Sequence, residues 1–237
     1  MSYSAIVVGA GSKIAQAIIE QLIALDDCQQ ILAISRGQNF EHEKVTAINT
    51  HYDEASIAHT CSELAPTFPV AKVFICQGIL HQGELQPERK LESISAENML
   101  KVFEANTVTP SLWLKYLTPH LKSSEPCKVA LFSARIGSIS DNQLGGWYSY
   151  RASKAALNMM VQTFAVELAR RAKNVKLLAF HPGTTDTPLS EPFQRSVPEG
   201  KLFTPEFVAT QLLSLLDRLE VDGHASYMDW NHQVITW

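Results

Sequence analysis

Short runs of β-branched and apolar residues alternate along the chain with longer runs whose apolar positions recur at helical spacing. The short runs predict buried strands, and the long runs predict helices. The predicted strands are Tyr3–Val8, Ile31–Ser35, Val45–Asn49, Val70–Cys76, Val129–Ser133 and Val175–Phe180, and the predicted helices are Ile14–Leu25, Ser56–Leu64, Glu97–Leu121 and Tyr150–Ala172. Thr204-Pro205-Glu206 is typical of the start of a last helix, and Ala225–Tyr227 is a candidate edge strand.

This repeated alternation of strand and helix predicts an α/β fold, with a doubly wound, mostly parallel sheet covered by helices on both faces. The 237 residues fit one such domain, so residues 1–237 are expected to form a single unit. Two stretches without clear periodicity, Gly78–Lys90 and Gly183–Phe203, are long enough to be functional loops. Loops at the carboxyl ends of parallel strands bind ligands, so the second, at about residues 183–203, is a candidate substrate loop.

Composition and charge narrow the function. The net charge is −4 and basic residues form only short runs, which does not favour binding to nucleic acid or to anionic membranes. No apolar stretch reaches the roughly 18 residues of a membrane span. The four cysteines are widely spaced, without a C-x-x-C motif, so no metal site is indicated. We expect a cytoplasmic protein whose partner is a small molecule, with neither nucleic acid nor membrane involved.

Tyr150 and Lys154 lie four residues apart at the start of a predicted helix, so their side chains share a face. A tyrosine has a pKa near about 10, and a cation close by stabilises its phenolate and lowers that value. The pair therefore predicts a general acid. Chance pairs at this spacing are not rare, so the place of the pair in the chain decides its meaning.

A glycine-containing turn joins the first strand to the first helix, the context in which a dinucleotide loop is expected. The turn reads Gly9-Ala10-Gly11-Ser12-Lys13-Ile14-Ala15. A pyrophosphate would bind the N–H groups at the start of that helix. Lys13 stands where a second glycine is usual, and it either adds a cation beside the phosphate or widens the loop. A plain strand-to-helix turn is the alternative.

The second strand ends in Ser35-Arg36, without the acid that would bind a free 2′-hydroxyl. A hydroxyl followed by a guanidinium suits a 2′-phosphate, so NADP(H) is favoured over NAD(H) as the cofactor. The alternative is that Arg36 is an ordinary surface cation. Asp53 is a candidate acceptor for the adenine amino group, and capping of the helix ahead of Ser56 explains it nearly as well.

With these two motifs in this order, the whole chain resembles a short-chain dehydrogenase/reductase. The stretch from Leu131 to Asn158 is similar to the C-factor group, relatives of the sniffer-type carbonyl reductases. The resemblance implies a seven-stranded Rossmann sheet, a nicotinamide cofactor, a homo-oligomer (dimer or tetramer) and a tetrad of Tyr, Lys, Ser and Asn. Carried over, Tyr150 is the acid/base, and Lys154 binds the nicotinamide ribose and lowers the tyrosine pKa.

The serine of the tetrad is ambiguous. The family usually carries Ser-Ser-x-x-Gly after the fifth strand, whereas this chain has Ser133-Ala134 followed by Gly137. Ser133 and Ser138 are the candidates to polarise the substrate oxygen, and Ser133 is slightly favoured. Either serine could instead bind only loop backbone.

Asn106 matches the active-site asparagine of the family. Pro110, four residues later, has no N–H, so the Asn106 carbonyl loses its helical partner and becomes available to water. We expect this water to continue a proton path from Lys154 to solvent. A simple helix kink is the alternative.

The resemblance also assigns further contacts to the cofactor. Pro182, Gly183 and Thr185 would hold the nicotinamide carboxamide, and the Thr187 hydroxyl would reach carboxamide or phosphate. Ile75-Cys76-Gln77-Gly78 takes the place of the family's Asn-Asn-Ala-Gly, and only Gly78 is retained. His181 replaces the common asparagine before Pro182 and is expected to be structural.

The sequence therefore predicts an NADP(H)-dependent oxidoreductase that transfers a hydride between nicotinamide and a carbonyl or alcohol substrate. Trp147, Leu144, Leu189, Phe193 and Phe203 are expected to form an apolar substrate wall. The alternative is a cofactor-binding or signalling protein of the C-factor type with little or no turnover. Lys13, Ala134 and Gln77 are the sequence features that support it.

Overall fold

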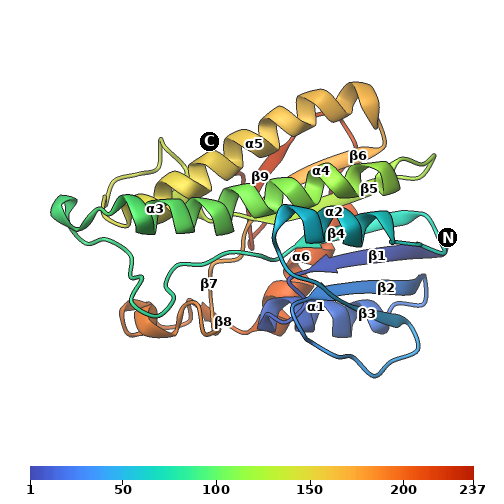
Figure 1. The fold of residues 1–237 in the computed structure, drawn as a ribbon, viewed down its shortest axis with the longest axis horizontal. Helices are drawn as coiled ribbons and strands as arrows, with labels where there is room; N and C mark the ends of the chain where they lie inside the picture. The colour runs from blue at the N-terminus through green and yellow to red at the C-terminus, as the bar shows by residue number, and fades with distance from the viewer.

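The computed structural model describes residues 1–237 and is built on a seven-stranded sheet in which all neighbouring strands are parallel (Figure 1). The strand order is β3-β2-β1-β4-β5-β6-β9. Their bounds are β1 Tyr3–Val8, β2 Cys28–Ser35, β3 Val45–Asn49, β4 Val70–Ile75, β5 Cys127–Phe132, β6 Val175–His181 and β9 Ser226–Asp229. The predicted α/β fold is confirmed. The strand order reverses between β1 and β4, where sheets of this kind bind ligands.

Helices cover both faces of the sheet, because the apolar side chains of each strand point alternately to either side. Ile6 and Val8 of β1 belong to one core, and Ala5 and Val7 belong to the other. The first core lies under α2, α4 and α5, and the second lies under α1 and α6 (Figure 1). The bounds are α1 Lys13–Ile23, α2 Glu54–Ser62, α3 Ala96–Phe103, α4 Thr109–Leu121, α5 Tyr148–Arg171 and α6 Pro205–Arg218.

The helix predicted over Glu97–Leu121 is interrupted, and that prediction is corrected. A π-helical turn, Glu104–Val108, separates α3 from α4. The N–H of Thr109 bonds to the carbonyl of Glu104, five residues back. Pro110, which cannot donate a hydrogen bond, then occupies the first turn of α4, where the lack of an N–H is tolerated. Asn106 lies inside the π turn.

The carboxyl-terminal elements follow the sequence pattern closely. Thr204 caps α6, its hydroxyl accepting the N–H of Phe207 at 3.2 Å. The last strand, β9, pairs in parallel with β6 at the sheet edge. The candidate substrate loop lies between β6 and α6 in the chain. Its two ends pair in parallel as the short strands β7 Thr184–Thr185 and β8 Leu202–Phe203. None of the helices combines the length and apolar content that crossing a membrane requires.

Candidate active site

A cavity of about 670 Å³ lies at the carboxyl ends of β1, β4, β5 and β6. Its lining includes these residues predicted for the site: Gly11, Ser12, Lys13, Ile14, Gly78, Ser133, Tyr150, Lys154, Pro182, Gly183, Thr185 and Thr187. The predicted residues outside the lining are Gly9, Ser35, Arg36, Asp53, Asn106 and Ser138. The fold therefore brings the tyrosine and lysine together with the glycine turn and with the loop after β6.

Tyr150 and Lys154 both project into this cavity from the start of α5. Lys154 is 3 % exposed, and its Nζ donates a hydrogen bond to the carbonyl of Phe132 at 2.8 Å. The same nitrogen lies 5.8 Å from the centroid of the Tyr150 ring. The amine is thus fixed between the end of β5 and the phenol.

Burial shifts the pKa values of Tyr150 and Lys154 so that the neutral form of each group is favoured. It raises the pKa of Tyr150 well above its ordinary value and lowers the pKa of Lys154 to about 7. The pKa of Tyr150 is therefore raised and not lowered as expected. The reason is that both groups lose water on burial, and an amine with a pKa of about 7 has lost its proton at the higher pH where a phenol ionises, so it offers the phenolate no positive charge.

Asn106 is fully buried and ties the loop after β4 to α5. Its side chain accepts the N–H of Ile79 at 2.7 Å and donates to the Ile79 carbonyl at 2.9 Å. It also donates to the Ser153 hydroxyl at 3.1 Å. Gly78 allows this close approach, since a Cβ there would lie 3.1 Å from both Asn106 Oδ1 and Lys154 Nζ. Asn106 therefore positions the floor of the cavity without lining it.

The two candidate serines lie in different places. Ser133 lines the cavity, and its hydroxyl donates to Asn158 Oδ1 at 2.6 Å. Ser138 lies outside the lining, and its hydroxyl accepts the N–H of Asp141 at 3.2 Å. Ala134 also lines the cavity, so the usual hydroxyl is missing there. Of the two serines, only Ser133 borders the space around Tyr150.

The turn after β1 presents the N-terminus of α1 to the cavity. Ser12 caps this helix by accepting the N–H of Ala15 at 3.3 Å. Gly9 has a φ of +80°, and a Cβ on it would lie 3.3 Å from the backbone of Cys76. A Cβ on Gly11 would meet nothing within 4 Å, so the backbone is open to a ligand there. With Lys13 beside it and no acid in its first turn, this helix end suits a phosphate.

Three cavity residues carry buried polar atoms without a hydrogen-bond partner. They are Gln77, through both side-chain polar atoms, His181, through Nδ1, and Thr185, through its hydroxyl. Each such atom costs about 1–3 kcal/mol unless a partner is supplied. Burial also lowers the pKa of His181 to about 4, so its ring is neutral at pH 7. The cluster indicates a site that a polar ligand completes. Gln77 was not among the predicted residues, and its only signal was the departure from Asn-Asn-Ala-Gly.

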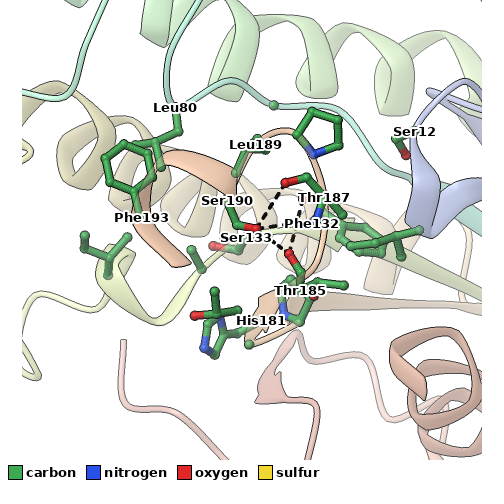
Figure 2. A pocket seen from close by; sticks show the side chains of 18 of the residues that line it. Ser12, Leu80, Phe132, Ser133, His181, Thr185, Thr187, Leu189, Ser190 and Phe193 are labelled. Atoms are coloured by element: carbon green, nitrogen blue, oxygen red, sulfur yellow. Dashed lines mark hydrogen bonds between the residues drawn. The ribbon is translucent and has the colours of Figure 1, made fainter. Parts of the chain in front are cut away.

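The loop after β6 is held by its own hydrogen bonds. The Ser190 hydroxyl donates to the carbonyl of Thr185 at 2.5 Å and to that of Thr187 at 3.1 Å. Figure 2 shows these three side chains grouped on one side of the cavity, with His181 and Ser133 nearby. The Thr187 hydroxyl donates to the Thr185 carbonyl at 3.3 Å, so it is engaged within the loop.

At the end of β2 the predicted residues have local partners. The Ser35 hydroxyl accepts the N–H groups of Gly37 and Gln38, at 3.2 and 2.7 Å. The Arg36 guanidinium lies 5.5 Å from the centroid of the Tyr52 ring. Asp53 caps α2, accepting both the N–H and the hydroxyl of Ser56, at 3.0 and 2.7 Å. The capping alternative for Asp53 is therefore the arrangement that the structure contains.

Aromatic side chains form one wall of the cavity. Trp147 packs against Phe193 and Tyr150, with ring centroids 4.9 and 6.2 Å apart. Leu80 and Leu189 complete this apolar side. Two residues expected here lie elsewhere and correct the prediction. Leu144 is 92 % exposed, and Phe203 packs on Trp230, with centroids 4.3 Å apart.

The burial of Lys154 gives a testable pH dependence. Between its folded pKa of about 7 and its ordinary value of 10.5, the unfolded chain binds more protons than the folded one. The stability contributed by this group is therefore lost as pH falls through that window and gained as pH rises. We expect the unfolding free energy of the wild type to rise relative to Lys154→Met by up to about 1.4 kcal/mol per pH unit between pH 7.5 and 9.5. Urea unfolding at several pH values measures it.

The exposed Lys173 offers the control for that experiment. Lys173→Met should unfold with the same pH dependence as the wild type. A constant difference between wild type and Lys154→Met across this pH range would mean that Lys154 is charged throughout.

Sequence comparison places the chain among known proteins. Residues 4–197 match the family described as short chain dehydrogenase. Benzil reductase ((S)-benzoin forming) of Bacillus cereus is 25 % identical over 242 residues, covering 91 % of this chain and 94 % of that enzyme. The 1-hydroxy-2-glutathionyl-2-methyl-3-butene dehydrogenase of Rhodococcus sp. is 35 % identical over 139 residues, 58 % of each chain. The C-signal of Myxococcus xanthus is 28 % identical over 147 residues, 62 % of this chain and 83 % of that protein.

Solved structures share the fold over the whole chain. An NADPH-bound carbonyl reductase from chicken fatty liver superposes with a TM-score of 0.84 at 21 % identity, covering 100 % of this chain and 99 % of that one. The carbonyl reductase Sniffer of D. melanogaster superposes with a TM-score of 0.83 at 16 % identity, covering 100 % of both. Together with the family match over most of its length, this fold shows that the chain belongs to the short-chain dehydrogenase family.

Proposed function

We propose that this protein is an NADP(H)-dependent carbonyl reductase in which Tyr150 is the general acid/base. The observation that carries the proposal is the shared cavity, where Tyr150, Lys154 and Ser133 face the phosphate-binding end of α1. The unpartnered polar atoms beside them call for a polar ligand. A cytoplasmic location and a homo-oligomeric state remain predictions from the sequence.

The residues present fit a nicotinamide dinucleotide. The N-terminus of α1, with Gly11, Ser12 and Lys13, would hold the pyrophosphate. The buried and unpartnered hydroxyl of Thr185 would bind the carboxamide, and Lys154 would bind the ribose hydroxyls. When bound, the nicotinamide supplies or accepts the hydride.

Tyr150 provides the proton that the substrate oxygen takes up on reduction. Its raised pKa keeps the phenol protonated at neutral pH, which is the state required of an acid. Lys154 acts through its charge, and negative charge brought into the cavity raises the pKa of its amine back toward the ammonium. The ammonium then stabilises the phenolate left after proton transfer. The acid is thus strengthened only when the site is filled.

A path for returning the proton runs past Asn106. Its side chain holds the backbone of Ile79 beside Lys154, and its own carbonyl faces no N–H at Pro110. A water at this carbonyl would connect the lysine to solvent. The π turn that contains Asn106 is the local irregularity that supports this role.

The preference for NADP(H) rests on the end of β2. Ser35 ends β2 and is buried, whereas Arg36, which follows it, is exposed with its guanidinium near the Tyr52 ring and would bind a 2′-phosphate. An NADPH-bound and an NADP-bound structure are among the proteins of the same fold. Lys13 adds a second cation at the phosphate end of the cavity.

The cavity wall favours a bulky apolar carbonyl compound as the substrate. Trp147, Phe193, Leu80 and Leu189 offer aromatic and aliphatic surface and no charge to the substrate side. The benzil reductases, similar over nearly the whole chain, act on such a compound by name. Benzil is accordingly the first carbonyl to test.

The second candidate is a signalling protein with little turnover, similar to the C-signal of Myxococcus xanthus. The observation in its favour is Ala134, which lines the cavity without the hydroxyl usual at this place. Tyr150 and Lys154, both retained at the cavity, favour the enzyme.

Tyr150→Phe removes the phenolic hydroxyl, and with it the proton to be donated, but keeps the aromatic ring. We expect the turnover of benzil with NADPH to fall by at least about 10²-fold, because general acid catalysis contributes about that much or more. The dissociation constant for NADPH should stay within about twofold, since the ring remains. Steady-state kinetics and fluorescence titration measure the two quantities. A variant that turns over like the wild type would exclude Tyr150 as the acid.

Cofactor preference is tested by binding. The wild type should bind NADPH more tightly than NADH, and Arg36→Ala should lose about tenfold for NADPH, about 1.4 kcal/mol, with little change for NADH. Arg218→Ala, an exposed arginine on α6, is the matched control. Tighter binding of NADH would overturn the preference, and a thermal shift with neither cofactor would favour the signalling candidate.

The two serines separate cleanly in a third experiment. In the proposed reaction the Ser133 hydroxyl, which donates to Asn158 Oδ1 in the structure, turns to the substrate oxygen. Ser133→Ala should then lower the turnover of benzil by about 10²-fold, the usual cost of losing one donor to a developing oxyanion. Ser138→Ala, outside the cavity, should leave turnover unchanged. Wild-type rates in both variants would remove serine from the mechanism.

A further inference from the structure

Glu88 is a buried carboxylate that the proposed mechanism does not use. It is 5 % exposed and lies in the loop between β4 and the short helical turn Leu91–Ser93. No lysine, arginine or histidine pairs with it. Its Oε2 accepts the N–H of Ser149 at 3.1 Å, and its Oε1 accepts the Ser149 hydroxyl. The partner of this charge is therefore the first turn of α5.

The first turn of α5 has no cap from its own sequence. Its N-cap residue, Trp147, has no side-chain acceptor and sits in the left-handed region with a φ of 53°. The free N–H groups of a helix start favour a negative charge, and Glu88 supplies one from 61 residues away. The Glu88 carbonyl also accepts the N–H of Trp147 at 2.5 Å. One residue thus bonds to both sides of the helix start.

This turn carries two residues that line the cavity, Trp147 and Tyr150. A left-handed backbone at a bulky residue is strained and persists only when its surroundings hold it. The Trp147 ring in turn packs on Phe193, from the candidate substrate loop. The bonds to Glu88 therefore decide where the phenol and the aromatic wall stand relative to each other.

We infer that Glu88 is a positioning residue, which caps α5 from outside and fixes the Trp147–Tyr150 turn for proton transfer. The inference rests on the proposed function, in which Tyr150 is the acid. Glu88 also joins two parts of the site, because Leu80, in the same loop, lines the cavity. Both carboxylate oxygens accept hydrogen bonds from Ser149. We therefore expect the length of the side chain, which we call its reach, to matter more for this positioning than its charge.

Three variants separate reach from charge. Glu88→Ala removes both side-chain hydrogen bonds to Ser149. Glu88→Asp keeps the charge, but its side chain is one methylene too short. Glu88→Gln keeps the length, and its amide can accept from the Ser149 N–H and donate to the Ser149 hydroxyl. We expect kcat for benzil reduction to fall about 10- to 100-fold in the Ala and Asp variants and to stay within about threefold in the Gln variant. The dissociation constant for NADPH should not change.

Hydrogen exchange supplies a readout that does not need turnover. Amides of residues 148–152 should exchange faster in Glu88→Ala and Glu88→Asp than in the wild type, while those of β4 and β5 should not. Glu84→Ala, at an exposed glutamate of the same loop, should match the wild type in both measurements. If Glu88→Ala does not fold, Glu88→Asp decides the question.

The outcomes are distinct. Wild-type kcat in Glu88→Ala and Glu88→Asp, with or without faster exchange, would overturn the positioning role. A loss in the Ala and Gln variants with wild-type kcat in the Asp variant would assign the effect to charge. An equal loss in all three variants would mean that the length of the side chain is not sufficient. Either result would overturn the positioning role as stated. If the wild type neither binds NADPH nor reduces benzil, the proposed function fails, and the exchange data alone decide whether Glu88 caps α5.

Discussion

The site depends on keeping the amine of Lys154 out of water. Its single hydrogen bond, to the Phe132 carbonyl, does not replace the hydration that a cation loses on burial. The pKa of about 7 is the result, and it makes the charge of this group responsive to whatever enters the cavity. The same bond ties α5 to the end of β5. Because Tyr150 lies one helical turn before Lys154, the bond also fixes where the phenol stands.

Close approach of three distant segments makes this burial possible. Gly78 has no side chain to keep the loop after β4 away from Lys154 and Asn106. Asn106 then bonds to both main-chain groups of Ile79 and to the hydroxyl of Ser153, the neighbour of Lys154. The π turn places Asn106 where α3 and α4 meet. The π turn, Gly78 and the buried amide of Asn106 therefore all contribute to the same packing of the loop after β4 against α5.

Much of the fold could be predicted because it depends on local pattern. Apolar runs such as Val45–Asn49 became strands with the predicted bounds, and the spacing of Tyr150 and Lys154 on one helix brought both into the cavity. The features missed depend on contacts between distant residues. The helical periodicity continues through Glu104–Val108, so only Pro110 hinted at a break.

Burial and orientation were equally invisible in the sequence. The pKa of Tyr150 follows from the protein packed around it, which no spacing reveals. An apolar loop residue can face a cavity, solvent or another aromatic ring, so Leu144 and Phe203 gave no signal of where they lie. Glu88 resembles any other acid in a loop until the fold brings it to Ser149. The sequence predicted which residues line the cavity better than it predicted the contacts that hold those residues in place.

The pairing of β7 with β8 has a consequence for how such a site can diversify. Thr184 pairs with Leu202 and Thr185 with Phe203, and the N–H of Asp186 donates to the Phe203 carbonyl at 2.8 Å. Both ends of the intervening segment are therefore fastened to each other, independently of the sheet. Lengthening or replacing the segment between them adds little closure entropy, and its contact with the start of α5 is the packing of Phe193 on Trp147. Evolution can therefore replace this segment and reshape one side of the cavity, while Tyr150 and Lys154 keep their places on α5.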